Sequence, residues 1–194
     1  MKVIFLDHDG VICLSSEWGG RHKKEKKFRD KTGIQGKLSS PKYGLPVDCR
    51  FDNFNKKAVK VLNQILEETD AEIVVSSDWK RWANVEEMGE YYESKGIIKK
   101  PIAFTDSILY DDYQDFPWHR NWDLEQTRSL EISQYLGQNP NITHWVAIDD
   151  LDMSLKPEGD KMWGLKNFVL TPLNNEGIKQ TGIKDKILNF LQSE

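Results

Sequence analysis

Short apolar runs bounded by polar residues predict the strands of this chain. Such runs occur at residues 2–6, 71–75, 102–104, 145–148 and 168–170. Runs of this length, rich in Val, Ile and Phe, are typical of buried strands rather than of helices. They are separated by longer stretches in which apolar residues recur with the spacing of a helix.

The clearest helix is expected at residues 54–68. Its apolar side chains fall on one face, and either Asn53 or Asn55 can cap its first turn. That face holds Ala58, Val61, Leu62, Ile65 and Leu66. Further helices are predicted at residues 84–95, 124–136 and 183–191, with Gly96 and Gly137 ending the first two.

Two segments lack regular spacing. Residues 14–50 are polar and basic and contain Gly and Pro, and residues 105–123 form an irregular, aromatic-rich stretch. Elsewhere strands alternate with helices, which favours one α/β domain over residues 1–194 with a mostly parallel sheet.

Polar residues follow three of the predicted strands: Asp7, Ser76 and Asp149. In open α/β sheets, ligands bind beyond the carboxyl ends of the strands, and parallel strands share that edge. We therefore expect these three oxygen-bearing side chains to lie in one site.

The acids at these strand ends indicate a metal site. Four carboxylates in one cleft, those of Asp7, Asp9, Asp149 and Asp150, would repel one another unless a cation lay among them. All-oxygen ligands suit Mg²⁺, which also binds phosphate oxygens, so the pattern favours phosphoryl transfer. A plain turn after the first strand would leave the acids at the other strand end unexplained. A calcium loop would place an oxygen ligand where Val11 stands.

Composition narrows the class of protein. The 194 residues are 38% hydrophobic and 30% charged, as in water-soluble globular chains. No apolar run approaches the roughly 18 residues of a membrane helix, and Asp7 interrupts the short apolar start, which argues against a signal peptide. We expect a cytoplasmic protein with no membrane partner. Cys13 and Cys49, without a CxxC pair, are expected to be reduced thiols.

Charge is uneven along the chain, although the net charge is only −4. Residues 21–31 hold seven Lys or Arg against two acids, whereas residues 106–125 hold six acids against one Arg. Such segments either steer anionic partners or are solvated faces and loops. Tryptophans near them either stack bases or pack in the core and rim. The tryptophans concerned are Trp18, Trp79, Trp82, Trp118 and Trp122.

These motifs resemble those of the haloacid dehalogenase (HAD) superfamily of phosphatases. Motifs one, two and four look like residues 5–11, 73–76 and 146–150. The chain is also similar to the small HAD domains of the Swiss Army Knife RNA-repair group, relatives of the phosphatase half of polynucleotide kinase-phosphatases. That similarity rests on residues 76–80, 128–136, 147–150 and 168–171. It implies a Rossmannoid three-layer sandwich with a small or minimal cap, and insertions at 14–50 and 97–123.

The resemblance also implies roles. Asp7 would attack phosphorus and form an aspartyl-phosphate. Asp9 would protonate the leaving oxygen and then deprotonate water, while its backbone carbonyl binds Mg²⁺. Ser76 would donate a hydrogen bond to a phosphoryl oxygen. The expected metal ligands are Asp7, Asp9, Asp149 and Asp150, and the further substrate contacts are Ser77, Gly10 and Lys80.

The basic residue of motif three is less clear from the sequence. Arg128 is the first candidate because it lies near a helix start and can fork to phosphate oxygens. Arg120 or a lysine is the alternative. The related group carries Arg after the tryptophan of motif two, whereas Lys80 follows Trp79 here, with Arg81 next.

Three functions remain open from the sequence. The first is a Mg²⁺-dependent phosphatase for nucleotides or nucleic-acid ends, because a small cap leaves the site open to bulky substrates. The second is a phosphatase for a small metabolite, with residues 14–50 closing over it. The third is a non-catalytic binding module on the same scaffold. His8, between the motif-one acids, is expected to pack or to contact the cap rather than to act in catalysis.

Overall fold

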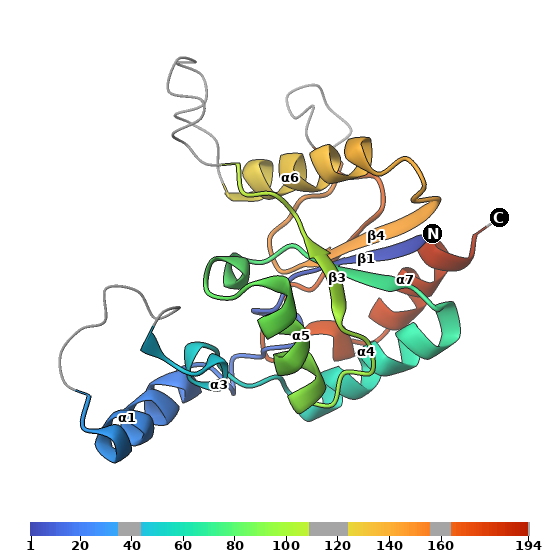
Figure 1. Cartoon of the computed structure of the whole chain (residues 1–194). Coiled ribbons are helices and arrows are strands. Elements are labelled where there is room, and N and C mark those ends of the chain that lie inside the picture. The colour runs from blue at the N-terminus through green and yellow to red at the C-terminus, as the bar shows by residue number, and fades with distance from the viewer. Residues whose placement is uncertain (35–43, 109–123, 156–163, 194) are drawn as a thin grey trace.

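The computed structural model shows an α/β fold built around one sheet (Figure 1). It describes residues 1–34, 44–108, 124–155 and 164–193. The predictions for Trp118, Trp122 and Arg120 fall outside these ranges, as do parts of both predicted insertions. Among the described helices, none is both long and apolar enough to cross a membrane.

All neighbouring strands of the sheet run parallel, in the order β3-β2-β1-β4-β5. The strands are β1 (Lys2–Leu6), β2 (Glu72–Val75), β3 (Pro101–Phe104), β4 (His144–Asp149) and β5 (Phe168–Leu170). Each lies within one residue of its predicted bounds, so the predicted parallel sheet is confirmed. Central β1 pairs with β2 on one side and with β4 on the other.

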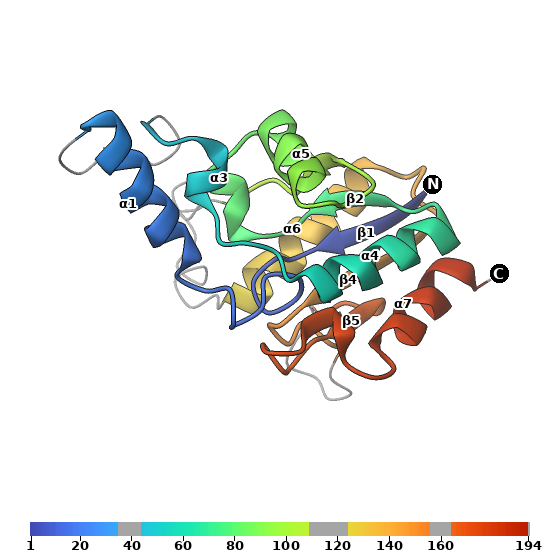
Figure 2. The same ribbon diagram turned by 90° about the horizontal axis from the view of Figure 1, so that it is seen from below.

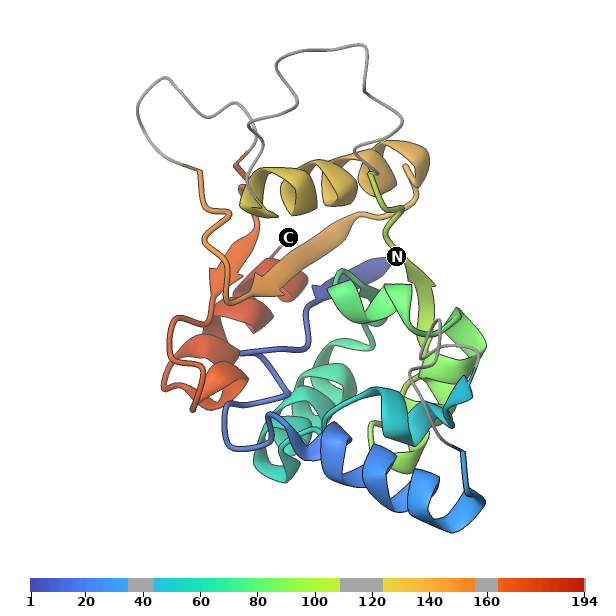
Figure 3. The ribbon, with the colours of Figure 1, turned by 90° about the vertical axis from the view of Figure 1, so that its left-hand side faces the viewer.

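Helices cover both faces of the sheet. They are α4 (Lys56–Thr69), α5 (Val85–Ser94), α6 (Leu124–Gln138) and α7 (Ile183–Gln192). Ile4 and Leu6 of β1 pack in one apolar cluster with α4, α5 and α7, whereas Val3 and Phe5 pack in a second cluster with Ile132 of α6. Figure 2 shows α4, α5 and α7 on the near face of the sheet, and Figure 3 shows α6 across the opposite face. The predicted three-layer arrangement is confirmed.

The helix ends agree with local sequence signals except in one case. The side chain of Asn55 accepts hydrogen bonds from the N–H groups of Lys57 and Ala58, so Asn55, not Asn53, caps α4. The predicted end of α6 at Gly137 is wrong, because the helix continues to Gln138. The side-chain amide of Asn139 donates to the Tyr135 carbonyl and satisfies that helix end without a glycine cap.

In the described part of the predicted insertion at 14–50 lie the helices α1 (Gly20–Thr32) and α3 (Val47–Arg50). No residue of α1 is buried, and the helix projects from the sheet while contacting α3 (Figures 1 and 2). Asp52 accepts hydrogen bonds from the N–H groups of Gly19 and Arg21, at 3.2 and 2.6 Å, and so anchors the start of α1. That residues 14–50 act as a cap over the active site stays a prediction.

Candidate active site

Three aspartates meet at the carboxyl ends of the two central strands. Asp7 directly follows β1, Asp149 is the last residue of β4, and Asp150 comes next. Carboxylate oxygens of the three lie within 4.8 Å of one another, and Asp7 and Asp149 are buried. The sheet register explains this meeting, because Leu6 pairs with Ile148, and Asp7 and Asp149 are the next residues along these two neighbouring segments. This buried oxygen set suits a hard divalent cation such as Mg²⁺.

A guanidinium lies against the same carboxylates. Nη1 of Arg128, in the first turns of α6, is 3.1 Å from Oδ1 of Asp7 and 2.8 Å from Oδ2 of Asp149. The structure therefore brings Arg128 to the acids, while the alternative Arg120 lies outside the described residues. The Arg128 guanidinium supplies one positive charge to three acidic side chains, so it does not balance their charge when all three are ionised.

Burial dominates the electrostatics of these acids. It raises the pKa of Asp7 well above its usual value, against the opposing charge of Arg128. Burial likewise raises the pKa of Asp149 to about 6, and the pKa of Asp150 to about 6. Asp7 lies close enough to Asp150 to add to the latter rise. A bound cation would remove this mutual repulsion, so the donor set fits Mg²⁺.

Asp9 stands apart from the three clustered acids. Its carboxylate Oδ2 accepts a 2.8 Å hydrogen bond from Nε1 of Trp79, in the short helix η1 (Asp78–Arg81). Burial raises the pKa of Asp9, and the hydrogen bonds from Trp79 and Cys13 oppose that rise. A carboxyl group with a raised pKa, held outside the cluster of three acids, has the properties of a general acid. The sequence pattern did not indicate the indole contact.

The two serines after β2 have different surroundings. Ser76 is buried, and its hydroxyl has no hydrogen-bond partner among the described residues. Ser77 contributes a side-chain hydrogen bond that lowers the pKa of Asp7, a smaller effect than burial. The Ser77 oxygen also accepts from the Trp79 N–H at 3.5 Å. An unpartnered buried hydroxyl is costly, so Ser76 is suited to receive a ligand oxygen.

Gly10 permits the close approach of Asp150. Its φ is +69°, and a Cβ placed on it would lie 2.3 Å from Oδ2 of Asp150. The Gly10 carbonyl accepts a hydrogen bond from the Thr171 hydroxyl, which lies at the end of β5. Glycine is thus required here by backbone conformation and by space. The predicted contact of Gly10 with substrate stays a prediction.

Lys80 forms a buried network beside the acids. Its Nζ donates to Oε2 of Glu131 at 2.5 Å, to the Thr105 hydroxyl at 3.0 Å and to the Asp106 carbonyl at 3.3 Å. Glu131 lies on α6 one turn beyond Arg128, so the network ties η1 to the helix that supplies the guanidinium. Sequence reasoning missed Glu131. The substrate contact expected of Lys80 stays a prediction.

Aromatic side chains pack around Trp79, the residue that donates to Asp9. Trp79 stacks between Phe51 and Phe54, with ring centroids 4.6 and 5.4 Å away and interplanar angles of 9° and 12°. His8 is fully buried against Trp79, and its Nε2 lies 2.6 Å from the Tyr92 hydroxyl. Burial lowers the pKa of His8 to about 3, so the ring is neutral. His8 is therefore a packing residue, as expected, whereas Trp79 both packs in this cluster and donates to Asp9.

The fold and the site define an α/β domain with a buried acidic cluster at the carboxyl edge of its sheet. The family described as "HAD domain in Swiss Army Knife RNA repair proteins" matches residues 3–181, and the chain belongs to this family. The match confirms the resemblance seen in the motifs. Searches of curated proteins and of solved structures gave no match.

Proposed function

We propose that this protein is a Mg²⁺-dependent phosphomonoesterase that acts through an aspartyl-phosphate on Asp7. The observation that carries the proposal is the cluster of Asp7, Asp149 and Asp150, whose oxygens lie within 4.8 Å of one another beside Arg128. HAD domains are typically phosphohydrolases, and the family match supports the same reaction class.

The metal would be held by the three clustered carboxylates and by the backbone carbonyl of Asp9. When bound, Mg²⁺ supplies positive charge that stabilises the phosphoryl oxygens during transfer. Arg128 adds a second positive charge, because it contacts both Asp7 and Asp149. Together these groups would allow an anionic phosphate to approach an anionic nucleophile.

The reaction has two steps. In the first, a carboxylate oxygen of Asp7 bonds to phosphorus while the bond to the leaving oxygen breaks, and Asp9 transfers its proton to that oxygen. In the second, water attacks phosphorus and gives a proton to Asp9, and the bond between Asp7 and phosphorus breaks to release phosphate. The Trp79 indole keeps the Asp9 carboxyl in place for both proton transfers.

Ser76 would donate its unpartnered hydroxyl to a phosphoryl oxygen. Ser77, Gly10 and Lys80 would complete the phosphate site through hydroxyl, backbone and charge. As substrate we propose a phosphate on a nucleotide or at a nucleic-acid end, since the family is that of RNA repair proteins. The competing function is hydrolysis of a phosphate on a small metabolite.

A phosphatase panel tests the proposal. The purified chain is assayed with Mg²⁺ on an aryl phosphate, nucleotides, sugar phosphates and oligonucleotides carrying 3′- or 5′-phosphates. We expect Asp7→Asn to lower kcat by a factor on the order of 10³ or more, because it removes the nucleophile. Asp185→Asn makes the same chemical change at an exposed acid on α7 and should leave kcat unchanged.

Substantial turnover by purified, folded Asp7→Asn would contradict the mechanism. If only sugar phosphates are hydrolysed, the nucleic-acid substrate is wrong while the chemistry stands. Failure of the wild-type chain to hydrolyse any phosphate with Mg²⁺ would overturn the proposed activity and favour a binding module.

A further inference from the structure

A small groove lies beside the Asp9 side of the site, between α1, α3 and the residue that follows η1. Its volume is about 200 Å³, and its lining includes Arg21, His22, Cys49, Arg50 and Trp82 together with one acid, Glu25. The Glu25 carboxylate is paired with Arg29, at 2.8 Å. A groove of this size is smaller than a drug-sized pocket and fits one planar group. The proposed phosphatase reaction uses none of the residues named in this lining.

Two basic side chains face outward at this groove. Arg21 and His22 are exposed in the first turn of α1, and within the described residues Arg21 forms no ion pair. Arg50 is different, because its Nη1 is 3.0 Å from Oε2 of Glu87 and is largely buried. The groove therefore offers the charge of Arg21 to an anionic ligand, while Arg50 serves the fold.

Trp82 provides an aromatic surface in the same groove. Its side chain is 37% exposed, in contrast to Trp79, which is 5% exposed within the aromatic stack. The backbone of Trp82 is held from both sides: its N–H donates to the Trp79 carbonyl at 3.0 Å, and its carbonyl accepts from Arg50 at 3.0 Å. An exposed indole on a held backbone, beside a cation, matches the pairing that single-stranded nucleic-acid sites use.

The groove adjoins the position of the leaving group. Trp82 ends the turn whose Trp79 donates to the Asp9 carboxylate, and Arg21, which also lines the groove, donates its N–H to Asp52. A group bonded to the oxygen that Asp9 protonates would thus extend toward the groove.

We propose that this groove binds the nucleotide attached to the scissile phosphate of an oligonucleotide end, with its base on Trp82 and a backbone phosphate at Arg21 and His22. This proposal rests on the proposed function, because the nucleotide is the leaving group of that reaction. It also gives residues 14–50 a function: α1 supplies the cationic side of the groove and so selects polynucleotide over small phosphates.

Binding and turnover are measured separately to test the groove. Affinity of a labelled, terminally phosphorylated oligonucleotide is measured by fluorescence anisotropy on the Asp7→Asn chain, alone and combined with Arg21→Ala, Trp82→Ala or Trp82→Phe. We expect Trp82→Ala to weaken binding by about fivefold or more and Trp82→Phe to restore most of it, because a phenyl ring still stacks. Arg21→Ala should reduce the slope of log affinity against log salt by about 0.7, which is the contribution of one phosphate contact on a single strand.

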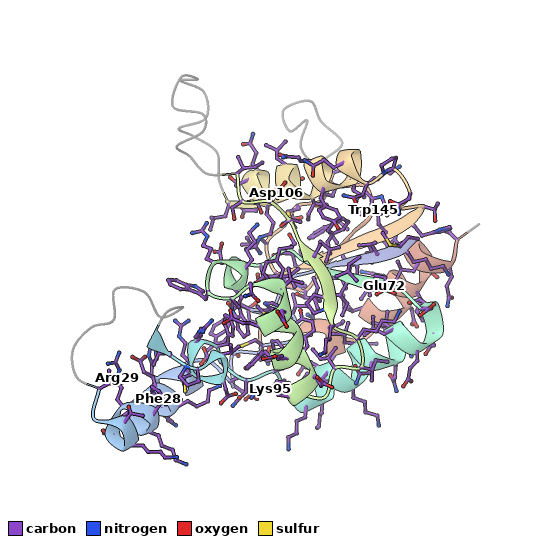
Figure 4. The ribbon with its side chains drawn as sticks, viewed as in Figure 1. Phe28, Arg29, Glu72, Lys95, Asp106 and Trp145 are labelled. Carbon is purple, nitrogen blue, oxygen red and sulfur yellow. The ribbon has the colours of Figure 1, made fainter. Side chains whose placement is uncertain are left out.

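Lys31→Ala is the matched control. It removes the same charge from the last turn of the same helix, about 15 Å from Arg21 along the axis. Figure 4 shows this helix with its Phe28 and Arg29 labelled. In the active chain, Arg21→Ala should lower the ratio of kcat/KM on the oligonucleotide to kcat/KM on an aryl phosphate by about tenfold. Lys31→Ala should leave that ratio unchanged.

The results separate this inference from the proposed function. If Arg21→Ala and Trp82→Ala leave oligonucleotide affinity unchanged, the groove proposal is overturned, whatever the activity. If a sugar phosphate competes at the groove as well as the oligonucleotide does, the ligand class is wrong. If the groove variants weaken binding but the wild-type chain hydrolyses no phosphate, the groove proposal holds and the proposed reaction fails.

Discussion

Replacing Gly10 with alanine tests whether the close contact between the first loop and Asp150 holds the acidic cluster together. The new Cβ would lie 2.3 Å from Oδ2, 2.6 Å from Cγ and 2.7 Å from Cβ of Asp150. Ordinary contact begins at 3.4 Å, so the carboxylate would have to retreat by about 1 Å. Because Cβ of Asp150 is also too close, rotation of the side chain alone does not relieve the clash.

Two costs follow from this geometry. The φ of +69° at Gly10 lies in the left-handed region, where a side chain costs roughly 1–2 kcal/mol. Overpacking against Asp150 adds about 1–3 kcal/mol. We therefore expect Gly10→Ala to lower the free energy of unfolding by about 2–5 kcal/mol. The displaced carboxylate should also weaken Mg²⁺ binding by about 10- to 100-fold.

Gly96→Ala separates the two costs. Gly96 has a φ of +83° but no atom within 4 Å of a new Cβ, so it carries the backbone cost alone. Urea unfolding gives both free energies, and calorimetric titration gives Mg²⁺ affinity. We expect Gly96→Ala to cost about 1–2 kcal/mol and to leave Mg²⁺ affinity unchanged. Equal destabilisation by the two variants, with equal Mg²⁺ affinity, would refute the role given to the contact between Gly10 and Asp150.

Two further predictions concern buried charge. Glu131→Ala leaves the Lys80 ammonium buried without its partner and should destabilise the chain by about 3–5 kcal/mol in urea unfolding. The double variant Lys80→Met with Glu131→Leu should recover most of the lost stability. No recovery in the double variant would contradict the pairing of Lys80 with Glu131. Burial raises the pKa of Asp149 and Asp150 to about 6, so the folded state holds their protons more tightly and loses stability as pH rises from about 4 to about 6. Mg²⁺ should therefore raise the Tm more at pH 7 than at pH 5, and equal shifts at the two values would argue against ligation by these acids.

Local pattern was sufficient for the strands and for most helices. A buried strand in a parallel sheet is apolar on both faces, so runs such as that of β1 stand out from their polar surroundings. The end of α6 was mispredicted because Gly137 costs only about 1 kcal/mol inside a helix, which the packing of Tyr135 and Leu136 offsets. Helix α1 was not predicted because it has no buried face, and its anchor at Asp52 lies far along the chain.

The acids of the site were predictable, and Arg128 was the first candidate for their basic partner, with Arg120 or a lysine as the open alternative. Asp7 and Asp149 follow apolar runs, and parallel pairing alone brings such strand ends to one edge. Which arginine reaches them depends on how α6 lies across the sheet, and only the structure brings Arg128 to 3.1 Å from Asp7.

The sequence by itself determined the parallel α/β class and the acids that stand at the strand ends, because these depend on hydrophobic period and on residue type. The tertiary structure decided which side chains meet. It paired Asp9 with the Trp79 indole, Lys80 with Glu131, and Arg21 with the groove at Trp82. These pairs join residues 51 to 70 positions apart, and their distances depend on how helices pack on the sheet rather than on any local pattern.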